Sequence, residues 1–301
     1  MLDPHGLYEL ADDLPELDGV VLVQALTGFV DAGSAIQLSR EHLLEQFDGR
    51  VLATFDIDQL LDYRSRRPTM IFVEDHWESY EQPTLALHLL KDLTGTPFLL
   101  LAGPEPDLHW ERFIKAVRGL IERFGVSLTV GLNAIPMAVP HTRPVSVTAH
   151  ATDQRLLGER ESWLQRVQVP ASVGNLLEFR LGEAGLDAMG YAAHVPHYLA
   201  QTSYPAAAEL LVESVATTTG LVLPTAALHE AAVEIRAEID KQVADDEQAT
   251  RLVTSLEGQY DSFVRGRTGN LLAEPGGDLP SADELGAELE RFLAEQARDT
   301  D

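Results

Sequence analysis

The amino-acid sequence predicts an α/β fold in which a mixed sheet lies between helices. Short apolar runs of strand length alternate with longer segments of helical periodicity along most of the chain. Two pairs of runs, near 84–102 and 126–151, have the close spacing of hairpins and so predict antiparallel as well as parallel neighbours. The 301 residues and a hydrophobic content of 45% suffice for one large domain.

The strands are predicted from apolar or β-branched runs that turn residues bound. The first, from Gly19 to Ala25, is almost continuously apolar, as expected for a strand buried on both faces. The other predicted strands, in chain order, are Val51–Phe55, Thr69–Val73, Thr84–Leu90, Phe98–Ala102, Val126–Leu132, Val145–Ala151 and Ala188–Val195.

The helices are predicted from apolar residues at three- and four-residue spacing. The clearest covers 107–124, where Trp110, Phe113 and Val117 share one face and Gly125 follows as a stop. The other helix predictions in this part of the chain are the segment after Ser34 through Phe47, Val173–Gly182 and Ala206–Thr218.

The pattern changes after Pro224. Two apolar stripes, beginning at Leu228 and at Ala249, predict a pair of helices, and the Gly- and Pro-rich stretch 265–280 predicts a linker. A helix-start signature at 281–284 predicts a last acidic helix to about residue 297. We therefore expect an α/β domain over 1–223 and an acidic helical extension over 224–301.

The composition limits the classes of function. A formal net charge of −26 disfavours nucleic acid and anionic membranes as partners. The chain has no cysteine, which excludes disulfides, thiolate metal sites and a cysteine nucleophile. We find neither a signal peptide nor an apolar run of about 18 residues, so we expect a cytoplasmic protein. No motif predicts a metal or a cofactor.

The most informative polar segment is Pro140-His-Thr-Arg-Pro144, which leads directly into a β-branched run. The two prolines stiffen the loop that carries His141 and Arg143. Stiff polar loops at strand ends often form binding surfaces. The alternative is that both side chains only brace the loop through hydrogen bonds and ion pairs.

The segment Gly28–Ser34 has the spacing of a phosphate loop, but the lysine that should precede Ser34 is absent. A nucleoside triphosphatase is therefore disfavoured. We expect Gly33 to form the turn and Asp31 or Ser34 to cap the following helix. A contact between the free amides of the helix start and a small anion is the alternative.

Two further segments allow both a functional and a structural interpretation. Arg64 and Arg67 belong to a basic cluster that would suit an acidic partner or an anion, or would pair with the chain's own carboxylates. The segment 74–81 mixes aromatic and acidic residues in what we interpret as a loop, either an interface or ordinary surface.

His194 and His197 form a His-x-x-His pair, but Pro196 lies between them. Because the surrounding residues favour extended backbone, the two side chains should point to opposite sides. We therefore expect structural histidines and no metal site. No Gly-x-Ser-x-Gly nucleophile motif occurs.

Five separated phrases resemble the proteasome assembly chaperone family in its actinobacterial form. The resemblance runs from about Gly19 to Phe263. Its phrases are Phe29–Gly33, Phe55–Arg64 with Arg67-Pro68, Val139–Pro144 with Val147–His150, Gly174–Glu183 and His194–Leu199.

The resemblance implies an α/β body similar to purine nucleoside phosphorylases, with a helical C-terminal addition and self-association, a trimer being the favoured state. It also implies a non-enzymatic chaperone role in assembling the proteasome core particle. The alternative is an enzyme or binding protein for a nucleoside-like or other small anionic ligand.

Loops at strand ends give the candidate site, because α/β sheets bind ligands there. We expect at least two of the loops 29–34, 63–67, 133–143 and 194–198 to converge in one cleft. Asp31, Asn133, His141 and Arg143 should face that cleft. The full set of candidate ligand- or partner-binding residues is Asp31, Gly33, Arg64, Arg67, Asn133, His141, Arg143 and His197.

Overall fold

A computed structural model describes residues 3–28, 30–158 and 166–271. The chain divides into two compact units, Met1–Val253 and Thr254–Asp301. The first unit holds the sheet and the helices that cover it, and the fold and sites below belong to it.

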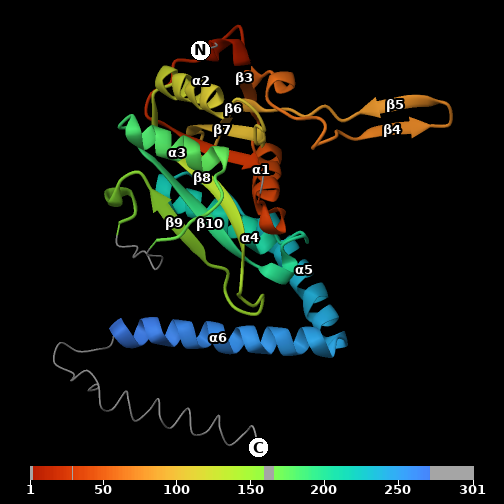
Figure 1. Ribbon diagram of the computed structural model, residues 1–301. Coiled ribbons are helices and arrows are strands. Elements are labelled where there is room, and N and C mark those ends of the chain that lie inside the picture. The colour runs from red at the N-terminus through yellow and green to blue at the C-terminus, as the bar shows by residue number, and fades with distance from the viewer. Residues whose placement is uncertain (1–2, 29, 159–165, 272–301) are drawn as a thin grey trace, which may run out of the picture. The chain divides into compact units, whose positions relative to one another are not determined.

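An eight-stranded mixed sheet forms the centre of the first unit, which confirms the predicted fold class (Figure 1). β7, β2, β8 and β10 are mutually parallel, and the outer strands pair antiparallel. In sheet order the strands are β1 (Tyr8–Leu10), β3 (Arg50–Phe55), β6 (Ala86–Lys91), β7 (Pro97–Pro104), β2 (Val20–Thr27), β8 (Val126–Met137), β10 (Ala188–Pro196) and β9 (Val147–Ala151).

Helices cover both faces of this sheet. α1 (Ala35–Gln46), α4 (Pro205–Thr219) and α5 (Ala226–Asp245) pack on one face and share a single apolar core with it. α2 (Trp110–Arg123) and α3 (Val173–Glu183) cover the other face with a second core. The central strands are buried on both faces, which explains why their sequences are continuous apolar runs.

α2 shows how the local sequence sets a helix. Phe113, Val117 and Leu120 repeat along one face and are buried against the sheet. The helix ends before Gly125, whose φ of +59° is the left-handed conformation that favours glycine. The predicted helix over 107–124 is thus confirmed, with its first turn at Trp110.

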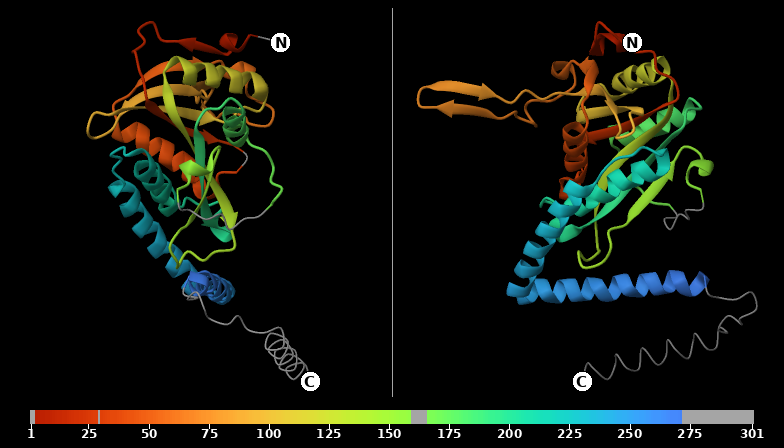
Figure 2. Two further views of the ribbon diagram at one scale, coloured as in Figure 1. Left: turned by 90° about the vertical axis from the view of Figure 1, so that its left-hand side faces the viewer. Right: turned by 180° about the vertical axis from the view of Figure 1, so that it is seen from behind.

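Residues 70–80 correct one interpretation of the sequence. The segment 74–81, expected to be a loop, instead contains β5 (His76–Tyr80), which pairs antiparallel with β4 (Met70–Val73) in a separate two-stranded ribbon. We call this ribbon the arm. It extends away from the sheet and its helices (Figure 2). Neither face of the arm is buried. The alternation of apolar and polar residues that marks a half-buried strand is therefore not expected in its sequence.

The described chain after Pro224 is mainly helical, as expected. α5 begins at Ala226, and its Leu228 and Ile239 join the core on the α1 face. α6 runs from Glu247 to Leu271 and so extends into the predicted linker 265–280. The rest of that linker and the predicted helix over 281–297 lie outside the described residues.

Candidate functional site

The principal cavity of interest lies at the carboxyl ends of the central parallel strands. We call it the sheet pocket. It has a volume of about 470 Å³. β2 leads into α1 on one face and the neighbouring β7 leads into α2 on the other, so their ends form a switch point of the type that binds ligands in α/β sheets. Gly28 and Glu105, which follow these two strands, both line the pocket.

Gln24 of β2 is the most unusual residue of the sheet pocket. It is only 5% exposed, between Leu22 and Leu26 on the same face of the strand. Its carboxamide has no hydrogen-bond partner within 3–28, 30–158 and 166–271. Among the described residues no side-chain polar atom is both fully buried and unpaired, so the Gln24 amide reaches the cavity and is available to a molecule there.

Other hydrogen-bonding side chains surround this amide. His150 and Glu178 form a pair, with 2.9 Å between the imidazole Nδ1 and a carboxylate oxygen. The buried Glu105 carboxylate accepts a hydrogen bond from the backbone N–H of Val173. The polar residues that line the pocket are Gln24, Glu105, Asn133, Thr148, His150, Ser172, Asn175 and Glu178. No lysine or arginine is among the described lining residues.

Asp31 and Gly33 position the loop between β2 and α1. The Asp31 carboxylate accepts backbone hydrogen bonds from Ile36 at 2.7 Å and Gln37 at 3.1 Å, as expected for a capping residue. Burial raises the pKa of this carboxyl, and the two backbone N–H groups oppose that shift. Gly33 has a φ of +68°, and a Cβ there would lie 2.7 Å from Cβ of Tyr204.

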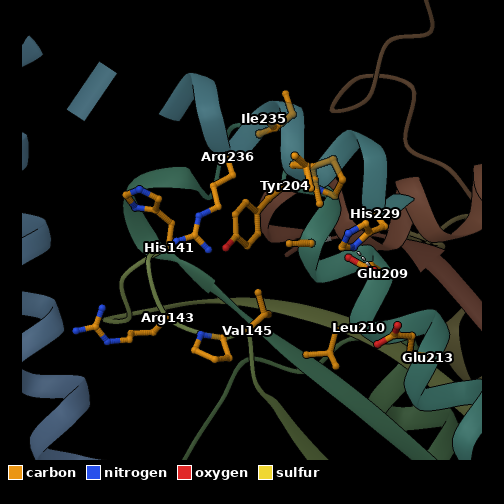
Figure 3. A pocket seen from close by; sticks show the side chains of 15 residues that line it. His141, Arg143, Val145, Tyr204, Glu209, Leu210, Glu213, His229, Ile235 and Arg236 are labelled. Atoms are coloured by element: carbon orange, nitrogen blue, oxygen red, sulfur yellow. Dashed lines mark hydrogen bonds and ion pairs between the residues drawn. The ribbon is translucent and has the colours of Figure 1, made fainter. Parts of the chain in front are cut away.

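A second cavity, of about 380 Å³, lies between the loop after β8 and the helices α4 and α5. We call it the helix pocket (Figure 3). His141 is buried at one end of it, where its backbone N–H donates to the Tyr198 hydroxyl at 2.9 Å. That hydroxyl also lies 2.6 Å from His141 Nδ1, and Nε2 lies 3.0 Å from the Asp240 carboxylate. Both ring nitrogens of His141 are hydrogen-bonded when the Tyr198 hydroxyl donates to Nδ1 and the Nε2–H donates to Asp240.

The other end of the helix pocket carries acidic side chains. Glu209 pairs with His229 at 2.9 Å, and Glu213 lies beside them (Figure 3). Arg143 and Arg236 also line this pocket, with Arg236 3.8 Å from Asp240. Burial raises the pKa of the Tyr204 hydroxyl in the pocket wall to about 12. Charges of both signs therefore line this cavity.

The basic cluster lies apart from both pockets. Arg66 forms an ion pair with Asp107, whereas Arg64 and Arg67 are exposed at the surface. Tyr63 donates to Asp58 at 2.7 Å, and this hydrogen bond raises the pKa of its hydroxyl. The cluster follows η3 (Ile57–Gln59) and precedes the arm.

The two histidines of the His-x-x-His pair have different environments. His194 is buried and lies 3.0 Å from the Ser146 hydroxyl and 2.8 Å from the Thr148 hydroxyl. Burial lowers the pKa of its imidazole. His197 is exposed and packs edge-on against the Tyr198 ring. In the described part of the chain, no cluster of three potential metal ligands occurs.

The structure thus brings some of the predicted site residues together and separates others. Asn133 shares the sheet pocket with Gly28 and Val30 of the loop after β2. His141 and Arg143 line the helix pocket instead, and Asp31 lines neither. The four residues expected to face one cleft therefore do not share a cavity.

Sequence reasoning missed Gln24, Asn175 and Glu178. A signal for Gln24 was present, because a lone amide interrupts the apolar run Val20–Leu26. Asn175 and Glu178 lie within one of the phrases that carry the family resemblance, Gly174–Glu183, but nothing local shows that they line the same pocket as Gln24.

Comparison with known protein families identifies the family to which the chain is related. Residues 25–243 match the PAC2 family. The chain belongs to the PAC2 family. This confirms the resemblance found in the sequence. No curated protein is significantly similar to the chain.

Solved structures of similar proteins have the same fold. A Mycobacterium tuberculosis protein of unknown function is 51% identical, with a TM-score of 0.86 over 89% of this chain and 92% of that one. A Corynebacterium glutamicum protein of unknown function is 41% identical, with a TM-score of 0.82 over 86% of this chain and 98% of that one. A Mycobacterium tuberculosis proteasome-assembly chaperone homologue is 26% identical, with a TM-score of 0.70 over 78% of this chain and 100% of that one.

No helix in the described part of the chain is both long enough and apolar enough to cross a bilayer.

Proposed function

We propose that this PAC2 protein is a non-enzymatic assembly chaperone whose partner is the proteasome core particle. Its likeness to a proteasome-assembly chaperone homologue supports the choice of partner. The arm is the observation that carries a role in protein–protein contact. We place the protein in the cytoplasm, where newly made core-particle subunits are assembled.

The arm presents apolar and aromatic side chains that a free chain would leave in water. Phe72 is 55% exposed and Trp77 63% exposed, and their ring centroids lie 5.0 Å apart. An isolated two-stranded ribbon is at best marginally stable in water. Exposed aromatic residues with acidic neighbours such as Glu74 and Glu78 suit the apolar centre and polar rim of an interface. Contact with another chain would therefore stabilise the arm.

Self-association is the first role we assign to the arm, with a trimer as the expected state. The matching experiment is light scattering on the purified protein, whose single-chain mass is 33.0 kDa. We expect a mass of about three chains for the wild type and a shift toward one chain when Phe72 and Trp77 are both changed to Ser. Phe179→Ser is the matched control, because Phe179 is 59% exposed on α3, away from the arm. A wild-type mass of 33 kDa would refute self-association.

The partner is tested by co-purification. A tagged copy expressed in its own host should recover core-particle α and β subunits, identified by mass spectrometry, and recovery should be highest when assembly is incomplete. An unrelated acidic protein of similar charge is the control, because a net charge of −26 alone can attract basic proteins. Absence of core-particle subunits above that control would refute the proposed partner.

The sheet pocket favours a second candidate function, binding of a small ligand. It is a preformed cavity of about 470 Å³, a volume within the range of small-molecule sites. Its polar groups converge from strands and from α3, which is typical of a site that fixes ligand orientation. A screen of metabolites against the purified protein tests this function separately from proteasome binding.

A further inference from the structure

We infer that the sheet pocket binds an uncharged small molecule that presents a hydrogen-bond donor and an acceptor side by side, as carboxamides and heterocyclic bases do. This inference concerns the ligand-binding candidate and does not depend on the proteasome as partner. It rests on the unpaired Gln24 amide, the other free amides of the pocket and the charge of its lining.

Gln24 offers both halves of a paired hydrogen bond. Its carboxamide carries a donor, Nε2–H, and an acceptor, Oε1, on one edge. The side chain is nine-tenths buried and lines the pocket, yet neither group has a partner in the described ranges. A planar ligand edge with an adjacent acceptor and donor would satisfy both groups at once, as Gln does with adenine.

The surroundings of Gln24 keep this amide uncovered. Gly131 of β8 lies beside it, and a Cβ there would be 3.0 Å from Oε1. Gly174 at the start of α3 lies on another side, where a Cβ would be 2.9 Å from both Oε1 and Nε2. Two neighbours of the amide are thus glycines, which have no side chain to cover it or to pair with it.

Further free hydrogen-bonding groups line the same pocket. Asn133 accepts from the backbone N–H of Ala134 through Oδ1 at 2.8 Å, which leaves its amide nitrogen as a donor. The side-chain amide of Asn175 and the Nε2 of His150 have no partner within the described residues. A ligand with several polar atoms can therefore be held from more than one side.

The charge of the lining decides against an anion. Glu105 and Glu178 are the ionisable acids of the pocket, and the described lining offers His150 as its sole basic group. His150 is already paired with Glu178. In the described lining, a phosphate or carboxylate would meet two acidic side chains and no guanidinium or ammonium partner, which is unfavourable in a partly buried site. The small anionic ligand considered from the sequence is therefore disfavoured by the described lining of this pocket.

The apolar part of the lining suits a flat ring. Val167 and Val169 line the pocket while remaining 58% and 68% exposed. Leu26 and Ile135 line it from the strands. A ring between these side chains would remove apolar surface from water, while its polar edge reaches Gln24.

A matched pair of probes tests the ligand class. Nicotinamide and nicotinate share one ring and differ in a carboxamide against a carboxylate. We would measure saturation-transfer NMR of both at millimolar concentration with the full chain, together with adenine, cytosine and inorganic phosphate. We expect signals from the uncharged probes and none from nicotinate or phosphate. Equal binding of nicotinate, or no binding of any uncharged probe, would overturn the inference.

Variants then locate the site. Gln24→Met keeps the side-chain length and removes the amide, so binding of the uncharged probes should weaken at least tenfold. Gln242→Met, on the exposed surface of α5, is the control and should bind as the wild type does. Asn175→Leu is a second variant, from α3, in case Gln24→Met does not fold. Unchanged binding in folded Gln24→Met or in both pocket variants would show that the probes bind elsewhere.

Discussion

The imidazole of His141 lies 3.0 Å from the carboxylate of Asp240 and so joins the loop after β8 to α5. The same ring contacts the Tyr198 hydroxyl, which belongs to the segment after β10. Three segments distant in sequence are held by one buried histidine. His141 therefore has a structural role in this loop, although it belongs to no catalytic motif.

Asp240→Ala should destabilise the protein because it leaves the buried Nε2–H of His141 without an acceptor. Loss of one partner of a buried hydrogen bond costs about 1–3 kcal/mol. Urea denaturation should show that loss, and Asp245→Ala near the exposed end of the same helix should show almost none. Equal effects of the two variants would mean that the His141 contact is not structural.

Gln24→Met should leave the free energy of unfolding within about 1 kcal/mol of the wild-type value, because the amide that it removes lines the pocket and has no partner within the described residues. Most substitutions of a buried residue destabilise instead. A loss larger than about 1 kcal/mol in thermal or urea unfolding would show that the amide has a structural role. Unfolding measurements thus test a structural role of Gln24, and ligand-binding measurements independently test its role in the pocket.

The Asp92 carboxylate links the turn after β6 to the segment between α4 and α5. It accepts from the backbone N–H groups of Thr94, Thr96 and Val222, each at 2.8 Å. Burial alone would raise its pKa, but these hydrogen bonds outweigh burial and lower the pKa to about 2 from 3.8. Because the folded-state pKa is the lower one, the stabilisation is complete above pH 4 and declines as pH falls from about 4 to 2.

Asp92→Asn should therefore be less stable than the wild type at pH 7, by about 2 kcal/mol. The difference should shrink toward pH 2, and urea denaturation at several pH values measures it. Asp48→Asn on the exposed surface is the control. A difference that stays constant between pH 7 and pH 2 would contradict the assignment of the low pKa to Asp92.

Gly33→Ala tests the close approach of the loop after β2 to Tyr204. The substitution adds left-handed backbone strain of about 1–2 kcal/mol and a methyl group 2.7 Å from Cβ of Tyr204. Gly95→Ala has a φ of +86° but nothing within 4 Å, so it carries the backbone strain alone. We expect Gly33→Ala to lower the melting temperature clearly more. Equal shifts would mean that the contact relaxes freely.

The fold was largely predictable because the spacing of apolar residues in the core strands and in α2 shows which of their side chains are buried. The run Val20–Leu26 and the face of Phe113 and Val117 show which side chains must be covered, whatever covers them. The first strand of the arm was predicted, since Thr69–Val73 matches β4, but β5 was not, because Trp77 and its neighbours pack into no core within the described chain.

The candidate site was predictable only in part. The carboxyl ends of the strands were the right place for Asn133, although it lies within β8 and not in the predicted loop, since the parallel strands bring these ends together. The partition of Asn133 and His141 between two cavities depends on which face of the sheet each segment joins. The meeting of Gln24 with Gly131 and Gly174 is a tertiary contact that no local pattern encodes.

Reconstitution of the proteasome core particle from its purified α and β subunits tests the proposed function most directly. Added at a fraction of the subunit concentration, this PAC2 protein should increase the rate at which full particles form, and it should be absent from the finished particle. The rate would be followed by native gel electrophoresis and native mass spectrometry. An assembly rate unchanged by the protein, with no complex between it and any subunit, would contradict the account.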